Sequence, residues 1–148
     1  NIVPYQVFKA RDKHMIIAVG TPAHWDRFCE MLNLGGIRTD PRFATNPDRI
    51  KNRIELIGLL ENLVAQQDAD YWLEKIRAAE IPCGPINSLD EALNDPHVQH
   101  RGLIIELEHP LGTLKMLGSP LHLSETPVTY RRRPPLLGEH TGEVLKEL

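Results

Sequence analysis

Histidine side chains are the groups of this chain best suited to acid–base chemistry, because an imidazole titrates near neutral pH. The sequence contains seven of them. His97 and His100 would share part of one face of a short helix after Pro96, where their interaction with the helix dipole explains them without a ligand. Glu139 and His140 could form an acid and base pair, but a carboxylate at a helix start is also explained by the dipole. We therefore predict no catalytic residue among these histidines.

His24 falls in the first turn of a predicted helix that Thr21 and Pro22 open. The backbone N–H groups of such a turn point outward and can bind an anion or a carbonyl oxygen. A surface position without a ligand is the simpler interpretation. The residues alone leave both interpretations open.

The two cysteines, Cys29 and Cys83, are far apart, and neither has a second Cys or His beside it at metal-ligand spacing. We predict two reduced thiols, no metal site and a cytoplasmic protein, since reduced cysteines are typical of that compartment. The sequence contains none of the P-loop, GxGxxG, GxSxG or HExxH motifs.

The composition bounds the remaining function classes. The 148 residues are 41% hydrophobic, which fits one soluble globular domain, and the formal net charge is −3. The only basic run, Arg131 to Arg133, is too short to predict nucleic-acid binding. No apolar run approaches the roughly 18 residues of a membrane span. We predict neither a nucleic-acid nor a membrane partner.

The first half of the chain reads as a hairpin followed by three helices. The strands are expected over residues 5–9 and 15–19. The first helix, capped by Thr21, should end near Gly35, and the longest should open at Asn46-Pro47. The third should start at Asp68 or Asp70. The apolar stripes predict three buried sets: Trp25, Phe28, Cys29 and Leu32; Ile50, Ile54, Ile57, Leu60 and Val64; and Trp72, Leu73 and Ile76.

The second half begins with caps and turns and ends in an extended segment. Ser88 and Glu91 have capping-box spacing, Asp95 precedes a proline at a helix start, and Gly102 can end that helix. A second hairpin is expected over residues 103–117, a proline-rich connector over 118–138 and a closing helix over 139–148. The fold class is therefore α/β (α+β): a small helix-rich domain with short strands and hairpins, then an extended C-terminal arm and a terminal helix.

Six segments, taken in order from Pro4 to Leu148, resemble the family III CoA-transferases. They are PYQVFKARD, IIAVG, DPRFATNPDRIKNR, IPCGPINSLDEALNDPHVQHRG, GSPLHLSETP and RRRPPLLGEHTGEVLKEL. The family includes formyl-CoA transferase, crotonobetainyl-CoA:carnitine CoA-transferase and α-methylacyl-CoA racemase. Single pieces such as PCGP are weak signals, whereas six in the family's order are specific.

The resemblance implies a longer protein with a large Rossmann-like N-terminal domain. Residues 1–107 would be its small (lid) domain, and residues 108–148 the arm that returns to the large domain. Two such chains would interlock as a homodimer. The start at Asn1, without a Met, is what we expect of a C-terminal fragment.

The resemblance also implies the chemistry. Coenzyme A would move between carboxylic acids through covalent intermediates on an aspartate of the large domain, with the acyl-CoA thioester as a substrate and no permanently bound cofactor. That aspartate would lie upstream of Asn1. We therefore expect no catalytic residue in this chain and no activity of the fragment alone.

The residues expected nearest the substrate are Tyr5, Gly20, Thr21 and His24. In the racemase, a glutamate after the strand that resembles IIAVG supports proton transfer. Ala23 takes that place here, which weakens a racemase function. An acyl-CoA racemase or isomerase, and a non-catalytic binding or interaction module, remain the alternatives to transfer.

Overall fold

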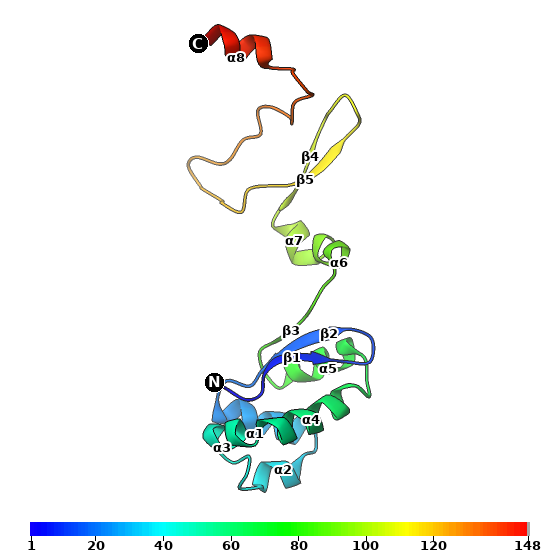
Figure 1. The fold of residues 1–148 in the computed structure, drawn as a ribbon, viewed down its shortest axis with the longest axis vertical. Helices are drawn as coiled ribbons and strands as arrows, with labels where there is room; N and C mark the ends of the chain where they lie inside the picture. The colour runs from blue at the N-terminus through cyan, green and yellow to red at the C-terminus, as the bar shows by residue number, and fades with distance from the viewer. Residues whose placement is uncertain (148) are drawn as a thin grey trace. The chain divides into compact units, whose positions relative to one another are not determined.

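The computed structural model describes residues 1–147, and the chain divides into two compact units, Asn1–Ile86 and Asn87–Leu148. Each unit is described by itself, and Figure 1 shows their elements. Both contain helices and short antiparallel strands, so the α+β class is confirmed. The proposed division into a lid domain, 1–107, and an arm, 108–148, remains a prediction about the domains of the whole protein.

The first unit is a three-stranded sheet covered by helices (Figure 1). Its sheet has the order β1-β2-β3, and both pairs are antiparallel. The predicted hairpin is confirmed, whereas the short third strand was not predicted. Its elements are β1 (Tyr5–Lys9), β2 (His14–Ala18), α1 (Pro22–Met31), α2 (Gly35–Thr39), α3 (Asn46–Lys51), α4 (Arg53–Val64), α5 (Ala69–Ala78) and β3 (Cys83–Pro85).

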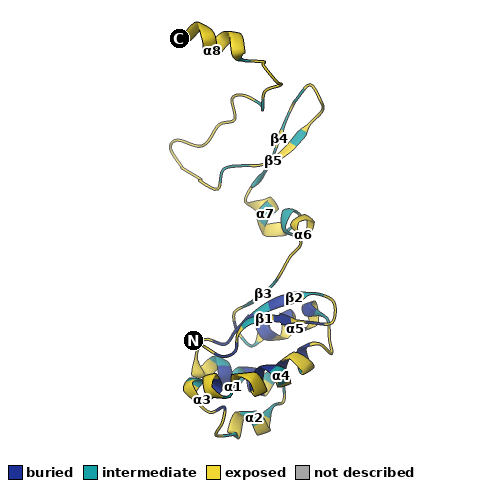
Figure 2. Ribbon diagram, viewed as in Figure 1, coloured by how far each residue is buried: buried dark blue, intermediate teal, exposed yellow. Residues whose placement is uncertain are grey.

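One apolar core lies between the sheet and the helices. Strand alternation places Phe8, Met15 and Ile17 on the same face of the sheet, and all three are buried. The helices α1, α4 and α5 bury the opposing apolar residues: Trp25, Phe28, Cys29, Leu56, Ile57, Leu60, Val64, Trp72, Leu73 and Ile76. In Figure 2 the buried residues are concentrated in this unit. The core predictions for α1 and α5 are thus largely confirmed, with Leu32 only partly buried.

The predicted longest helix is wrong in one respect, because it is two helices that meet at Asn52. This residue leaves helical geometry (φ −104°, ψ 25°), and its side-chain amide donates to the carbonyls of Arg42 and Asp48. The break changes which residues face the core. Ile54 is therefore 92% exposed and Ile50 is also exposed, in contrast to their predicted burial.

The helix starts follow the predicted local signals closely. Thr21 caps α1, its Oγ1 accepting the N–H of His24 at 3.1 Å. Thr45, rather than Asn46, caps α3 and forms a capping box with Asp48. The short helix α2 was not predicted.

The second unit contains two short helices, a two-stranded sheet and a terminal helix: α6 (Leu89–Leu93), α7 (Pro96–His100), β4 (Ile104–Leu107), β5 (Leu114–Leu117) and α8 (Thr141–Glu147). The caps at Ser88 and Asp95 are confirmed, and Gly102 has the expected left-handed conformation (φ 61°). The predicted hairpin is also confirmed. No residue from 87 to 147 is buried.

The segment between β5 and α8 has neither helix nor strand, as predicted. It is nevertheless held locally, because the N–H of Ser119 donates to the hydroxyl of Tyr130. A Cβ at Gly118 would lie 3.0 Å from that hydroxyl and 3.0 Å from Ile105 Cγ2, so a side chain there would require both neighbouring side chains to shift.

The basic run is paired within its own unit. Arg132 forms an ion pair with Glu143 at 2.7 Å, and Arg133 forms one with Glu139. These contacts account for two of the three charges in the run.

Candidate functional site

The predicted substrate-binding residues lie at one end of the three-stranded sheet. Tyr5 begins β1 and pairs with Ala18 near the end of β2, and the chain then continues into Gly20 and Thr21. The Val19 N–H donates to the Pro4 carbonyl at 2.9 Å and holds the two strand ends together. The hairpin therefore brings Tyr5 close to the turn that starts α1. Substrate binding by these residues stays a prediction.

Each of these residues offers a different chemical group. Tyr5 is 54% exposed, and Gly20 has open space where a Cβ would be. The Thr21 hydroxyl already accepts the first-turn N–H of His24 and so serves the helix cap. The His24 ring is half-buried, and its Nδ1 atom is buried with no hydrogen-bond partner among the described residues.

Arg53 lies beside Tyr5 and was missed by the sequence analysis. The two residues line a hollow of about 240 Å³ together with Asn1 and Ile2. Arg53 Nη2 donates to the Gln6 side-chain oxygen at 2.6 Å, and among the described ion pairs none involves Arg53. A guanidinium that no described ion pair occupies can bind a carboxylate or a phosphate.

The sequence analysis could not single out Arg53, because it placed this residue inside one long helix. In the structure Arg53 is the first residue of α4, where the helix dipole disfavours a positive side chain. A cation at such a position indicates some other use for the charge.

A second arginine, Arg49, contacts Val3 and Trp25, which are close in sequence to Tyr5 and His24, and is only 3% exposed. Its Nε donates to the Val3 carbonyl at 2.7 Å, and its Nη1 donates to the Phe43 carbonyl at 3.1 Å. The guanidinium carbon is 4.6 Å from the centre of the Trp25 ring. Burial lowers the pKa of Arg49. The sequence analysis missed this residue because α3 had been expected to bury its isoleucine instead.

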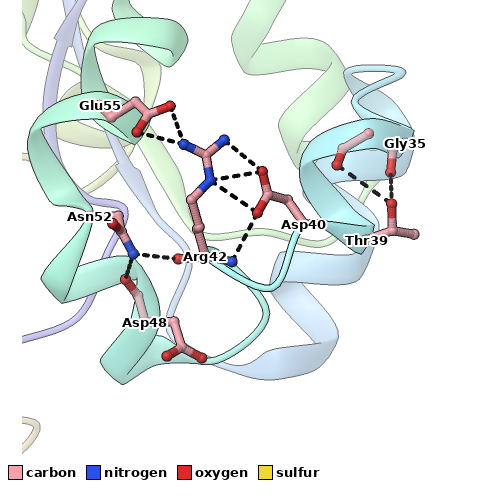
Figure 3. A network of polar contacts seen from close by, with 8 residues as sticks. Gly35, Thr39, Asp40, Arg42, Asp48, Asn52 and Glu55 are labelled. Atoms are coloured by element: carbon pink, nitrogen blue, oxygen red, sulfur yellow. Dashed lines mark hydrogen bonds and ion pairs between the residues drawn. The ribbon is translucent and has the colours of Figure 1, made fainter.

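Farther from the sheet end, Arg42 joins the loop before α3 to α4 (Figure 3). Its guanidinium contacts Asp40 at 2.7 Å and Glu55 at 2.7 Å. The side-chain hydrogen bond from Arg42 is the largest cause of the lowered pKa of Asp40. The network is about half exposed and is satisfied internally, so it offers no free group to a ligand.

Both cysteines are free thiols, and their environment disfavours the reactive thiolate form. Burial raises the pKa of Cys29 to about 12 and also raises the pKa of the half-buried Cys83. Over residues 1–147, no group of three or more His, Cys, Asp or Glu side chains is placed to hold a metal ion. In the same residues no helix has both the length and the apolar composition needed to cross a bilayer.

Six aspartates of this chain are engaged by neighbouring groups. Five accept hydrogen bonds near turns or helix starts: Asp12, Asp40, Asp48, Asp90 and Asp95. Asp26 differs, because it lies within α1 and forms an ion pair with Arg38 at 3.0 Å. None of these six has the environment of a free nucleophile.

The sequence profile of CoA-transferase family III matches residues 1–141. The chain belongs to this family. The resemblance drawn from the six segments is thereby confirmed.

Relatives of this family III chain carry transferase names. It is 36% identical to succinyl-CoA:glutarate CoA-transferase of Mus musculus and 38% identical to succinate–glutarate CoA-transferase of Agrobacterium fabrum, over the whole of this chain in both cases. It covers 34% and 37% of those relatives, so it spans about a third of the length of the curated relatives it matches.

A solved structure supports the same assignment. The crystal structure of a CAIB/BAIF family protein from Brucella suis matches 99% of this chain with a TM-score of 0.85 and 33% identity. The match covers 38% of that protein's chain.

Proposed function

We propose that the protein carrying this chain moves coenzyme A between carboxylic acids. The observation that carries the proposal is the match to two named CoA-transferases along the whole of this chain, at 36% and 38% identity. The names of those relatives suggest dicarboxylic acids, such as succinate and glutarate, as the substrates to try first. Coenzyme A enters as an acyl-CoA substrate, and no permanently bound cofactor is required.

The nucleophile of this reaction is an aspartate outside these 148 residues. This position is what the family resemblance implies, and the hydrogen bonds and ion pairs of the six aspartates considered above agree with it. The chain then serves as the lid domain and returning arm, and it has no activity alone. Its partners are the protein's own N-terminal large domain and a second, interlocked copy in a cytoplasmic homodimer.

The site that this chain contributes is the sheet end formed by Tyr5, Gly20, Thr21 and His24. Its exposed tyrosine and the half-buried imidazole are suited to contact the acyl end of the thioester. Changing His24 to Ala in the whole protein should alter the KM or the preference among acyl-CoAs. Unchanged kinetics across several acyl-CoAs would remove His24 from the site.

Transfer is favoured over racemisation by Ala23. This residue lies in the first turn of α1, and its methyl group can neither accept nor donate a proton. A racemase would wash deuterium from solvent into the α-position of an acyl-CoA without an acceptor acid. A transferase would not.

The test is net CoA transfer by the full-length protein. Succinyl-CoA is mixed with glutarate, and glutaryl-CoA is followed by mass spectrometry over a range of both concentrations. We expect glutaryl-CoA to form with ping-pong kinetics, and the 148-residue chain alone to form none. Turnover by the chain alone, or α-deuteration without an acid, would contradict the proposal.

A further inference from the structure

Arg49 is a buried cation that binds backbone carbonyls instead of a carboxylate. Its donors reach the carbonyls of Val3, Phe43 and Ala44 at 2.7, 3.1 and 3.4 Å. The face of the Trp25 ring supplies a further favourable contact for the charge. Arg49 therefore contacts three segments of the first unit: the residues before β1, the loop before α3, and α1.

Asn46, one turn earlier on α3, binds the same segment before β1. Its side-chain oxygen accepts the Val3 N–H at 3.0 Å, and its amide nitrogen donates to the Asn1 carbonyl at 3.0 Å. The segment before β1 is thus held by two side chains of α3.

Arg49 is linked to both halves of the candidate site, and Asn46 to the half that contains Tyr5. Val3 leads through Pro4 into Tyr5, and Trp25 directly follows His24. The Pro4 carbonyl also accepts the Val19 N–H, just before Gly20. Movement of the Arg49 side chain would therefore displace Tyr5 relative to His24.

We propose that Arg49 and Asn46 are positioning residues that hold Tyr5 and His24 in register for the acyl end of an acyl-CoA. The inference rests on the proposed function. An arginine suits this position because its fork of N–H donors serves several carbonyls while its flat face stacks on the indole. A lysine keeps the charge but satisfies fewer carbonyls, and a methionine leaves all of them unsatisfied.

The kinetic test uses Arg49→Lys, Arg49→Met and Asn46→Ala in the full-length protein. Arg42→Ala is the matched control, because Arg42 is an arginine of the same unit whose side chain contacts neither Val3 nor Trp25. Rates are taken per folded molecule, below the melting temperature of each variant. We expect the KM for succinyl-CoA to rise on the order of tenfold in Arg49→Met, less in Arg49→Lys, and not in Arg42→Ala.

A merely structural role would lower only the folded fraction, leaving both the KM and the kcat per folded molecule unchanged. That result in both Arg49 variants would overturn the proposal. If the wild-type protein transfers no CoA at all, the proposed function fails instead.

The holding role of Arg49 is then tested separately in the 148-residue chain by amide hydrogen exchange. We expect Arg49→Met to speed exchange of the Val3 and Val19 amides on the order of tenfold relative to wild type and to Arg42→Ala. Equal rates in all three proteins would overturn the holding role of Arg49.

Discussion

The two units of this chain differ in how they are stabilised. Every buried hydrophobic residue among those described lies between Val3 and Ile81, in the first unit. The second unit has caps, a hairpin and ion pairs but no buried residue from 87 to 147, as the exposed colouring in Figure 2 shows. The first unit therefore has a core of its own, whereas the second has only local interactions.

The two units therefore draw their stability from different interactions. A two-stranded sheet without a covering layer is marginal in water, and exposed ion pairs contribute little. The second unit also exposes apolar side chains: Leu111, Leu117, Leu121, Leu123, Leu137 and Leu145. We expect cooperative unfolding to report the first unit alone.

The largest effect is expected from truncation in the core of the first unit. Leu60 is fully buried in α4, so Leu60→Ala should lower the free energy of unfolding by about 2–5 kcal/mol through lost burial and a cavity. Urea denaturation followed by tryptophan fluorescence measures this, since both tryptophans lie in the first unit.

Two exposed positions serve as controls for Leu60→Ala. Ile54→Ala lies on the same helix but at an exposed position, and Leu137→Ala lies in the second unit. Both should change the free energy of unfolding by no more than about 0.5 kcal/mol. A loss of several kcal/mol from Leu137→Ala would show that the second unit shares the core.

A smaller effect is expected from the two capping boxes, one in each unit. Thr45 caps α3 and Ser88 caps α6 with the same arrangement. Thr45→Ala should lower the free energy of unfolding by about 1 kcal/mol, because α3 packs within the first unit. Ser88→Ala should leave the same urea transition unchanged. Equal losses would contradict independent stabilisation of the two units.

The dependence of the unfolding free energy on alkaline pH tests whether the Cys29 thiol is buried in the core. Its pKa is about 12 when folded and 9.0 ordinarily, so the folded protein keeps a proton that the unfolded chain releases. Stability from the neutral thiol is complete below pH 9 and declines as pH rises toward 12. The slope of unfolding free energy against pH should be less negative in Cys29→Ala. Identical slopes would contradict the burial of this thiol.

The smallest effect concerns the exposed network of Figure 3. Arg42 lowers the pKa of Asp40 below its ordinary 3.8, so its contribution is present above that pH and is lost as pH falls further. Thermal unfolding should therefore lose less stability on acidification below that pH in Arg42→Ala than in wild type. Equal acid sensitivity would mean that solvent screens the pair completely.

Features of the fold that depend on neighbouring residues could be predicted from the sequence. The caps at Thr21, Ser88 and Asp95 and the turn at Gly102 follow from short-range hydrogen bonds and backbone geometry. The break at Asn52 could not, because its side chain binds the carbonyl of Arg42, ten residues away. The pairing of β3 with β2 likewise depends on a distant strand.

The candidate site shows the same limit. A hairpin places Tyr5 beside the residues that follow its second strand, which agrees with the grouping of Tyr5 with Gly20 and Thr21 that the family resemblance suggested. Arg49 depends on Val3, which is 46 positions away, and no periodic pattern predicts that contact. Long polar side chains reach distant carbonyls that only the folded chain reveals.

Isotope exchange measures CoA transfer by the protein that carries this chain. The full-length protein is incubated with unlabelled succinyl-CoA and ¹³C-labelled succinate, with no other acid present. Reversible transfer of coenzyme A predicts that label enters succinyl-CoA, and that it does not when the 148-residue chain is used alone. The same exchange is run with other acyl-CoAs, each with its own labelled acid. If the full-length protein puts label into none of these acyl-CoAs, the protein does not transfer coenzyme A.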